Sequence, residues 1–177
     1  MGFAHLLGID VAVAAFKARF NIPHDVNIEF CLEGNIENDR LPRVVFFPLM
    51  AILESGVRFP INPLLLRTIS FYGLSPNQYL PNFYRVVSSV SHLNNLYILG
   101  FNHHDINFLY SICGGLKTSY YLIIRDPIVR LISRLPDSNR NAAGEFVKVS
   151  GNLLAGELTC PTSPWQISQN LYFLEHK

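Results

Sequence analysis

The residues that could support chemistry are few, and the only histidine cluster is His103-His104-Asp105. Imidazole and carboxylate groups bind zinc and transfer protons. Neighbouring residues on a helix point about 100° apart, so the two histidines cannot share one metal ion as an i, i+4 pair would. We therefore interpret the cluster as the first turn of a helix, where the helix dipole favours Asp105. No metal site is predicted.

Other catalytic patterns are incomplete. The segment 114–118, Gly-Gly-Leu-Lys-Thr, has the residue types of a phosphate loop, but that loop needs Gly directly before Lys and a second Gly five positions earlier. The three cysteines, Cys31, Cys113 and Cys160, are far apart and form no Cys-x-x-Cys pair, so neither a disulfide framework nor a zinc site is expected. We expect no enzyme and no cofactor.

Composition narrows the class of protein. The 177 residues are 49% hydrophobic and 15% charged, with a net charge of +1, whereas soluble domains average about 25% charged residues. High apolar content excludes disorder for the bulk of the chain, and the length suits one domain with a tail. With so few charges, we expect some apolar surface to remain for a protein partner.

Neither secretion nor membrane insertion is predicted. The N-terminus lacks a basic segment, and His5 and Asp10 interrupt what would be the apolar part of a signal peptide. The longest apolar run is Val44–Leu53, which contains Pro48 and is far shorter than the roughly 20 residues of a membrane span. We expect an intracellular protein with no membrane contact and no small-molecule substrate.

An α+β fold is predicted, mainly helical in its N-terminal two-thirds, with a small antiparallel β meander after residue 117. Cap residues mark several helix ends: Asn62 and Pro63 at a start, Gly73 at an end, and Asn102 with Asp105 at another start. Helices are expected at 3–20, 48–56, 62–73, 82–96 and 102–115, and strands at 26–31, 119–124, 129–132 and 146–149. The expected division is an N-terminal helix (1–20), an α+β domain (21–152) and a loop-rich tail (153–177).

Short motifs in a fixed order resemble a known family. They include Glu-Ser-Gly-Val-Arg-Phe-Pro at 54–60, Asn-Pro-Leu at 62–64 and Gly-Leu-Ser-Pro-Asn-Gln at 73–78. This series continues to residue 152 and is similar to the plant gypsy-type transposon domain, a retrotransposon-derived family. The resemblance implies a non-catalytic domain and carries over no catalytic residue. The heptad region that usually follows this domain does not occur before Lys177.

Three functional hypotheses follow. The favoured one is a protein–protein interaction or self-assembly module of the Gag-like kind, whose surface would include Val57, Phe59, Leu64 and Phe71. The alternative is a nucleic-acid-binding domain with a basic strand face. The residues of that face would be Arg125, Arg130, Arg134, Arg140 and Lys148. A third hypothesis is a truncated element copy without selected activity.

Overall fold

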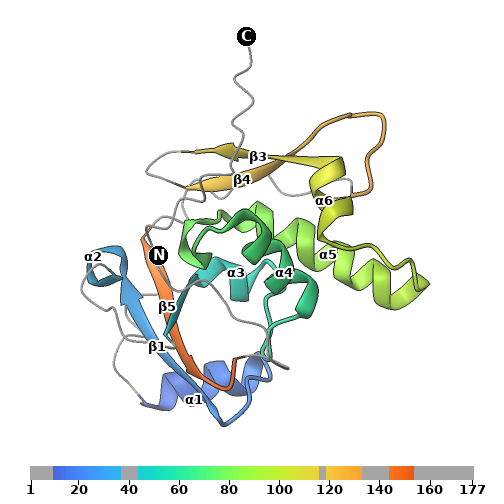
Figure 1. The fold of residues 1–177 in the computed structure, drawn as a ribbon. Helices are drawn as coiled ribbons and strands as arrows, with labels where there is room; N and C mark the ends of the chain where they lie inside the picture. The colour runs from blue at the N-terminus through green and yellow to red at the C-terminus, as the bar shows by residue number, and fades with distance from the viewer. Residues whose placement is uncertain (1–9, 37–43, 116–118, 133–143, 154–177) are drawn as a thin grey trace.

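The computed structural model describes residues 10–36, 44–115, 119–132 and 144–153 (Figure 1). These residues form an α+β fold, as predicted from the sequence. The elements follow one another as α1 (Asp10–Arg19), β1 (Val26–Leu32), α2 (Glu33–Ile36), β2 (Val45–Pro48), α3 (Leu49–Leu53), α4 (Pro63–Tyr72), the 3-10 turn η2 (Pro76–Gln78), α5 (Pro81–Tyr97), α6 (His103–Leu109), β3 (Tyr110–Gly114), β4 (Tyr120–Ile124) and β5 (Glu145–Gly151).

The larger sheet joins the two ends of the described chain. Its strand order is β1-β5-β2, and β5 is antiparallel to both neighbours, with Ile28 and Val45 on either side of Val149. The prediction of a single meander after residue 117 is therefore wrong, because β5 pairs with two N-terminal strands. Val147 and Val149 of β5 are fully buried on the face that joins the main core. The central position of β5 in the sheet therefore reflects the burial of its apolar side chains, because its partner strands are distant in the sequence.

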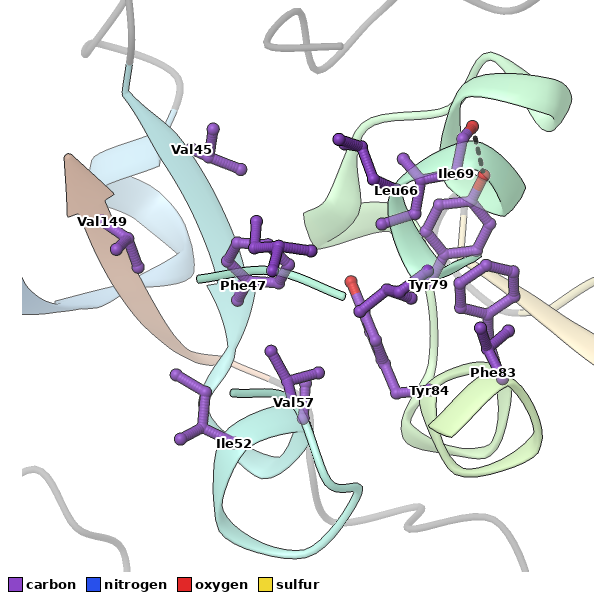
Figure 2. Packing of buried hydrophobic residues seen from close by; sticks show 14 of the residues in the cluster. Val45, Phe47, Ile52, Val57, Leu66, Ile69, Tyr79, Phe83, Tyr84 and Val149 are labelled. Atoms are coloured by element: carbon purple, nitrogen blue, oxygen red, sulfur yellow. Dashed lines mark hydrogen bonds between the residues drawn. The ribbon is translucent and has the colours of Figure 1, made fainter. Parts of the chain in front are cut away.

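The main core lies between this sheet and helices α4 and α5. Figure 2 shows the sheet and the helical layer facing each other, with Phe47 of β2 on the face of the sheet that is turned toward Tyr79 and Tyr84. Tyr79 stacks on Phe83 with ring centroids 3.8 Å apart, and the Tyr79 hydroxyl donates to the carbonyl of Ile69. The ring centroids of Phe47 and Tyr84 lie 6.1 Å apart across the two layers, and large aromatic side chains bury much apolar area each, so aromatic residues join the sheet to the helices.

The second sheet is a β3–β4 hairpin on the far side of α5 (Figure 1). Its first strand corrects two predictions. The helix expected over 102–115 ends at Leu109, because the chain turns extended at Tyr110 and pairs with β4 up to Gly114. Cys113, expected on that helix as a buried residue, is half-buried on β3. The strand expected at 129–132 is irregular chain.

The cap signals are confirmed. Asn62 accepts the N–H of Leu64 at 2.8 Å, Pro63 opens α4, and Gly73 ends it in the left-handed conformation at φ 67°. At α6, Asn102 accepts from His104, while its own N–H donates to Asp105 at 2.8 Å. These bonds satisfy backbone groups that helix ends leave free, so local sequence fixes where these helices begin.

Candidate protein-interaction surface

The most unusual surface feature is an apolar tip where α5 ends. Four consecutive side chains, Leu96, Tyr97, Ile98 and Leu99, are 58%, 66%, 91% and 48% exposed, and we name these residues the apolar tip. Single exposed apolar residues are ordinary, but a contiguous exposed group is a feature of interaction sites. In Figure 1 this end of α5 projects from the rest of the fold.

The backbone of the apolar tip is held in an unfavourable conformation. Ile98 caps α5 at φ 53° and ψ 42°, and its N–H donates to the carbonyl of Asn94. A left-handed backbone costs a β-branched residue about 1–2 kcal/mol, which is why Gly or Asn usually fills this position. Since the Ile98 side chain is almost fully exposed, its own packing does not offset that cost. Strained backbone of this kind concentrates at functional sites.

Hydrogen bonds to the end of α5 hold the segment that follows the apolar tip. The Asn94 side chain donates to the carbonyl of Phe101 at 2.6 Å and accepts the Phe101 N–H at 2.9 Å. Phe101 is half-buried against the main core, and the capped start of α6 follows it. The segment between α5 and α6 is therefore held at both ends, so the apolar tip has a defined position in the fold.

A second group of exposed aromatics lies where α4 meets α6. Phe71, the residue before the end of α4, contacts the rings of His103 and His104, with centroids 5.4 and 5.5 Å apart. Phe108 is 78% exposed and lies one helical turn after His104. This aromatic group of α4 and α6 extends the apolar surface available on the helical side of the fold.

His103 gives this region a dependence on pH. Burial lowers the pKa of His103, the positive charges of His104 and Arg67 lower it further, and Asp105 opposes them. The Nδ1 atom of His103 is buried and has no hydrogen-bond partner among the described residues. The folded state therefore resists protonation of this imidazole more than the unfolded state does.

We expect the free energy of unfolding to fall as the pH drops from about 7 to 5. An ordinary histidine has a pKa near 6.5, so the unfolded chain binds the proton first and stability is lost below that value. The measurement is urea unfolding of the protein and of His103→Gln at several pH values, with the exposed His92→Gln as control. An equal loss of stability in the protein and in His103→Gln would contradict the assignment.

The predicted partner surface is only partly exposed. Val57 and Phe59 are 1% and 5% exposed, and Phe59 packs edge-on against Phe47 in the core. The prediction that these two residues line a surface is therefore wrong. Leu64 is half-buried, and Phe71 alone of the four is exposed.

The predicted basic residues do not share one strand face. Arg125 follows β4, and its Nε atom donates to the carbonyls of Asn107 and Tyr110. Lys148 lies in the other sheet, 3.4 Å from the carboxylate of Glu29. Arg130 is exposed but lies on irregular chain, and Arg134 and Arg140 fall outside the described residues. The prediction of a single basic strand face is wrong for the three residues that the structure describes.

Candidate chemical groups were also located. Cys31 is buried and Cys113 half-buried, while Cys160 lies outside the described residues. Within the described ranges, no group of three or more His, Cys, Asp or Glu side chains could hold a metal ion. Among the described helices, none has the length and apolar character needed to cross a membrane.

Comparisons with protein-family models, curated proteins and solved structures found no match to this chain. Sequence reasoning missed the apolar tip, although one signal was present: the apolar run Leu-Tyr-Ile-Leu at 96–99 continues past the polar pair Asn94-Asn95 and ends at Gly100. A helix that ends at the surface ordinarily finishes with polar side chains.

Proposed function

We propose that this chain is a non-catalytic protein-association module and that the apolar tip is its contact surface. The observation that carries the proposal is Ile98, a β-branched residue that is 91% exposed and held in the left-handed region. Folding alone gives no advantage to this side chain at this position. A partner that covers the apolar tip would remove its apolar surface from water and offset the strain.

The proposal includes association with further copies of the chain, as in a Gag-like assembly. A plant retroelement origin is part of it and rests on the resemblance of the motifs between residues 54 and 152. The intracellular location expected from the N-terminus belongs to the same proposal. The favoured partner is a protein surface, because the apolar tip contains no charged side chain and interface cores are depleted of charge.

Two other hypotheses have less support. Nucleic-acid binding would use Arg125, Arg130 and Lys148, but Arg125 donates to backbone carbonyls and Lys148 pairs with Glu29. A truncated copy without selected activity would be favoured by soluble aggregate at every protein concentration. Steep loss of oligonucleotide affinity with added salt would favour the first of these hypotheses.

The test is the substitution Ile98→Gly, which should stabilise the fold and weaken association together. Glycine adopts the left-handed conformation freely, so we expect a gain of about 1 kcal/mol and a melting temperature higher by about 2–4 °C. Loss of the exposed side chain should lower the weight-average mass in light scattering at high protein concentration.

Ile128→Gly is the matched control, because Ile128 is 92% exposed and lies on a different segment. We expect this control to keep the association of the unmodified chain. If Ile98→Gly and Ile128→Gly associate equally well, the apolar tip is not the contact surface.

A further inference from the structure

The β3–β4 hairpin has two edges, and the described residues cover only one of them. On the outer side of β4, the carbonyl of Tyr120 accepts the N–H of Leu80 at 2.7 Å. Next to it, the Asn82 side chain accepts the N–H of Leu122 and donates to its carbonyl, at 3.2 and 2.8 Å. The amide of Asn82 thus occupies the place that a further strand would take. Figure 1 shows β3 as the strand farther from α5.

Hydrogen bonds at the two ends of the hairpin fix which β3 groups face outward. Arg125 donates to the carbonyl of Leu109, and Gly115 donates to the carbonyl of Ser119. Since bonding positions alternate along an antiparallel pair, positions 109, 111, 113 and 115 bond to β4. The backbone groups of positions 110, 112 and 114 therefore point away from β4.

Among the described residues, two of these outward positions lack a backbone partner. The N–H of Tyr110 donates to the carbonyl of Ile106, and its carbonyl accepts from the Arg125 guanidinium at 3.2 Å. The N–H and C=O groups of Ile112 and Gly114 have no partner among the described residues. An edge strand with free backbone groups is a template for another strand, and proteins usually protect it with charge, proline or a bulge. The sequence of β3, Tyr-Ser-Ile-Cys-Gly, contains neither charge nor proline, and its pairing with β4 is unbroken.

We propose that β3 pairs antiparallel with β3 of a second copy, about a two-fold axis that passes beside Cys113. Ile112 then lies opposite Gly114 of the partner subunit, and each such pair exchanges both of its hydrogen bonds. The occupant is a second copy, because a two-fold rotation places each outward N–H of this edge opposite an outward C=O of the partner subunit. An isologous contact of this kind closes a dimer. The contact is separate from the apolar tip, so either surface can fail without the other.

Hydrogen-bond accounting also selects the register. A two-fold axis at Ile112 would place Tyr110 opposite Gly114 of the partner subunit, although the Tyr110 N–H is already bonded to α6. The axis at Cys113 uses all four free groups of each copy and no other group. It also places Cys113 opposite Cys113 of the partner subunit in a non-hydrogen-bonded pair, where Cα atoms are about 4.5 Å apart.

The test is oxidative cross-linking of a chain with Cys113 as its sole cysteine, made by Cys31→Ala and Cys160→Ser. Cross-strand Cβ atoms lie about 4.5–5.5 Å apart, close to the roughly 3.5–4.5 Å of a disulfide. We expect air oxidation with copper phenanthroline to give a covalent dimer on a non-reducing gel. Unchanged thermal unfolding of the reduced chain checks that Cys31→Ala preserves the fold.

The control moves the thiol along the same face of the same strand, with Ser111→Cys and Cys113→Ser added to that background. The two thiols of a dimer would then be separated by about 13 Å, which is four residues of strand. We expect the thiol at 113 to cross-link at least about tenfold faster than the thiol at 111, since only the former meets disulfide geometry. Equal rates, or no dimer with either thiol, would overturn the proposal.

A second pair of variants needs no cysteine change. Gly114→Pro removes one outward N–H, whereas Gly114→Ala keeps it, and a Cβ at this position meets nothing within 4 Å. We expect Gly114→Pro to raise the dimer dissociation constant at least about tenfold, because it breaks both copies of one edge bond, and Gly114→Ala to leave it near that of the unmodified chain. Equal dimerisation by the two variants would overturn β3 pairing. Repeating the cross-linking in Ile98→Gly separates the surfaces: a persistent Cys113 dimer supports β3 pairing, and its loss there would show that β3 has no independent contact.

Discussion

Gly151→Ala should be the most damaging single substitution considered for this fold, with a loss of about 3–5 kcal/mol in the free energy of unfolding. Gly151 ends β5 opposite Val26 and has a φ of 99°, which only glycine adopts freely. A Cβ there would lie 2.1 Å from the carbonyl oxygen of Asp25 and 3.4 Å from the Cα of Val26. These contacts are backbone atoms, so β1 and β5 must separate locally.

Gly144→Ala separates the two causes of that loss. Gly144 also has a positive φ, 107°, but a Cβ there meets nothing within 4 Å. We expect this control to cost about 1–2 kcal/mol, which is the backbone cost alone. Urea unfolding of both variants gives the comparison. Equal costs for the two variants would show that β1 and β5 do not approach as closely as described.

Glu54→Ala should be the second most damaging substitution, with a loss of about 3 kcal/mol. Arg85 of α5 is 6% exposed, and its Nη2 atom lies 3.0 Å from the carboxylate of Glu54 at the end of α3. Its Nη1 atom is buried without a partner among the described residues. Removal of Glu54 would leave a buried guanidinium without its counter-charge. Glu54 is 52% exposed, so the cost lies at the low end of that for buried pairs.

Arg85→Met provides the matched comparison, because it removes the charge and keeps an apolar side chain of similar length. Replacing buried ion pairs by apolar residues is often neutral, so we expect the double variant Glu54→Ala/Arg85→Met to be more stable than Glu54→Ala. Glu29→Ala breaks the more exposed pair with Lys148 and should cost under about 1 kcal/mol. If Glu54→Ala costs no more than Glu29→Ala, the Arg85 pair is not a buried one in solution.

Local sequence signals predicted where three helices begin. Asn62 and Pro63 define the start of α4 through a short-range hydrogen bond and a preset dihedral angle, and Gly73 defines its end. Such signals act within one turn of a helix, so they require no knowledge of the remaining chain. This is why helix starts agree with the structure to within a residue at α4, α5 and α6.

Sheet pairing could not be predicted in the same way. The strand β5 was predicted, but its partners β1 and β2 lie about a hundred residues earlier. The sequence of β5 does not indicate with which strands it pairs. The strand β2 was missed because four buried residues, Val45–Pro48, continue into α3 without a change in composition. Short apolar runs fit a strand or a buried helix equally well.

Surface residues were the least predictable. Val57 and Phe59 were expected at a surface, yet they lie in the core. Of the apolar tip, only Leu96 was assigned from the sequence, as the last residue of a helix. Hydrophobicity indicates that a side chain should be covered, but it does not indicate whether the same chain or a partner covers it. Only the fold separates these two cases.

Two separate contacts would give the chain an extended mode of assembly. Pairing of β3 about a two-fold axis closes a dimer, and the apolar tips at α5 then link dimers into larger species. Ile98→Gly should therefore stop assembly at the dimer, and Gly114→Pro should weaken the β3 dimer while leaving the contact at the apolar tip.

The central claim is that this chain associates with its own copies, and light scattering after size-exclusion chromatography over a wide concentration range tests it most directly. We expect a dimer of twice the 20.1 kDa chain mass at low concentration and larger species as the concentration rises. A monomer of 20.1 kDa at every concentration would contradict the account.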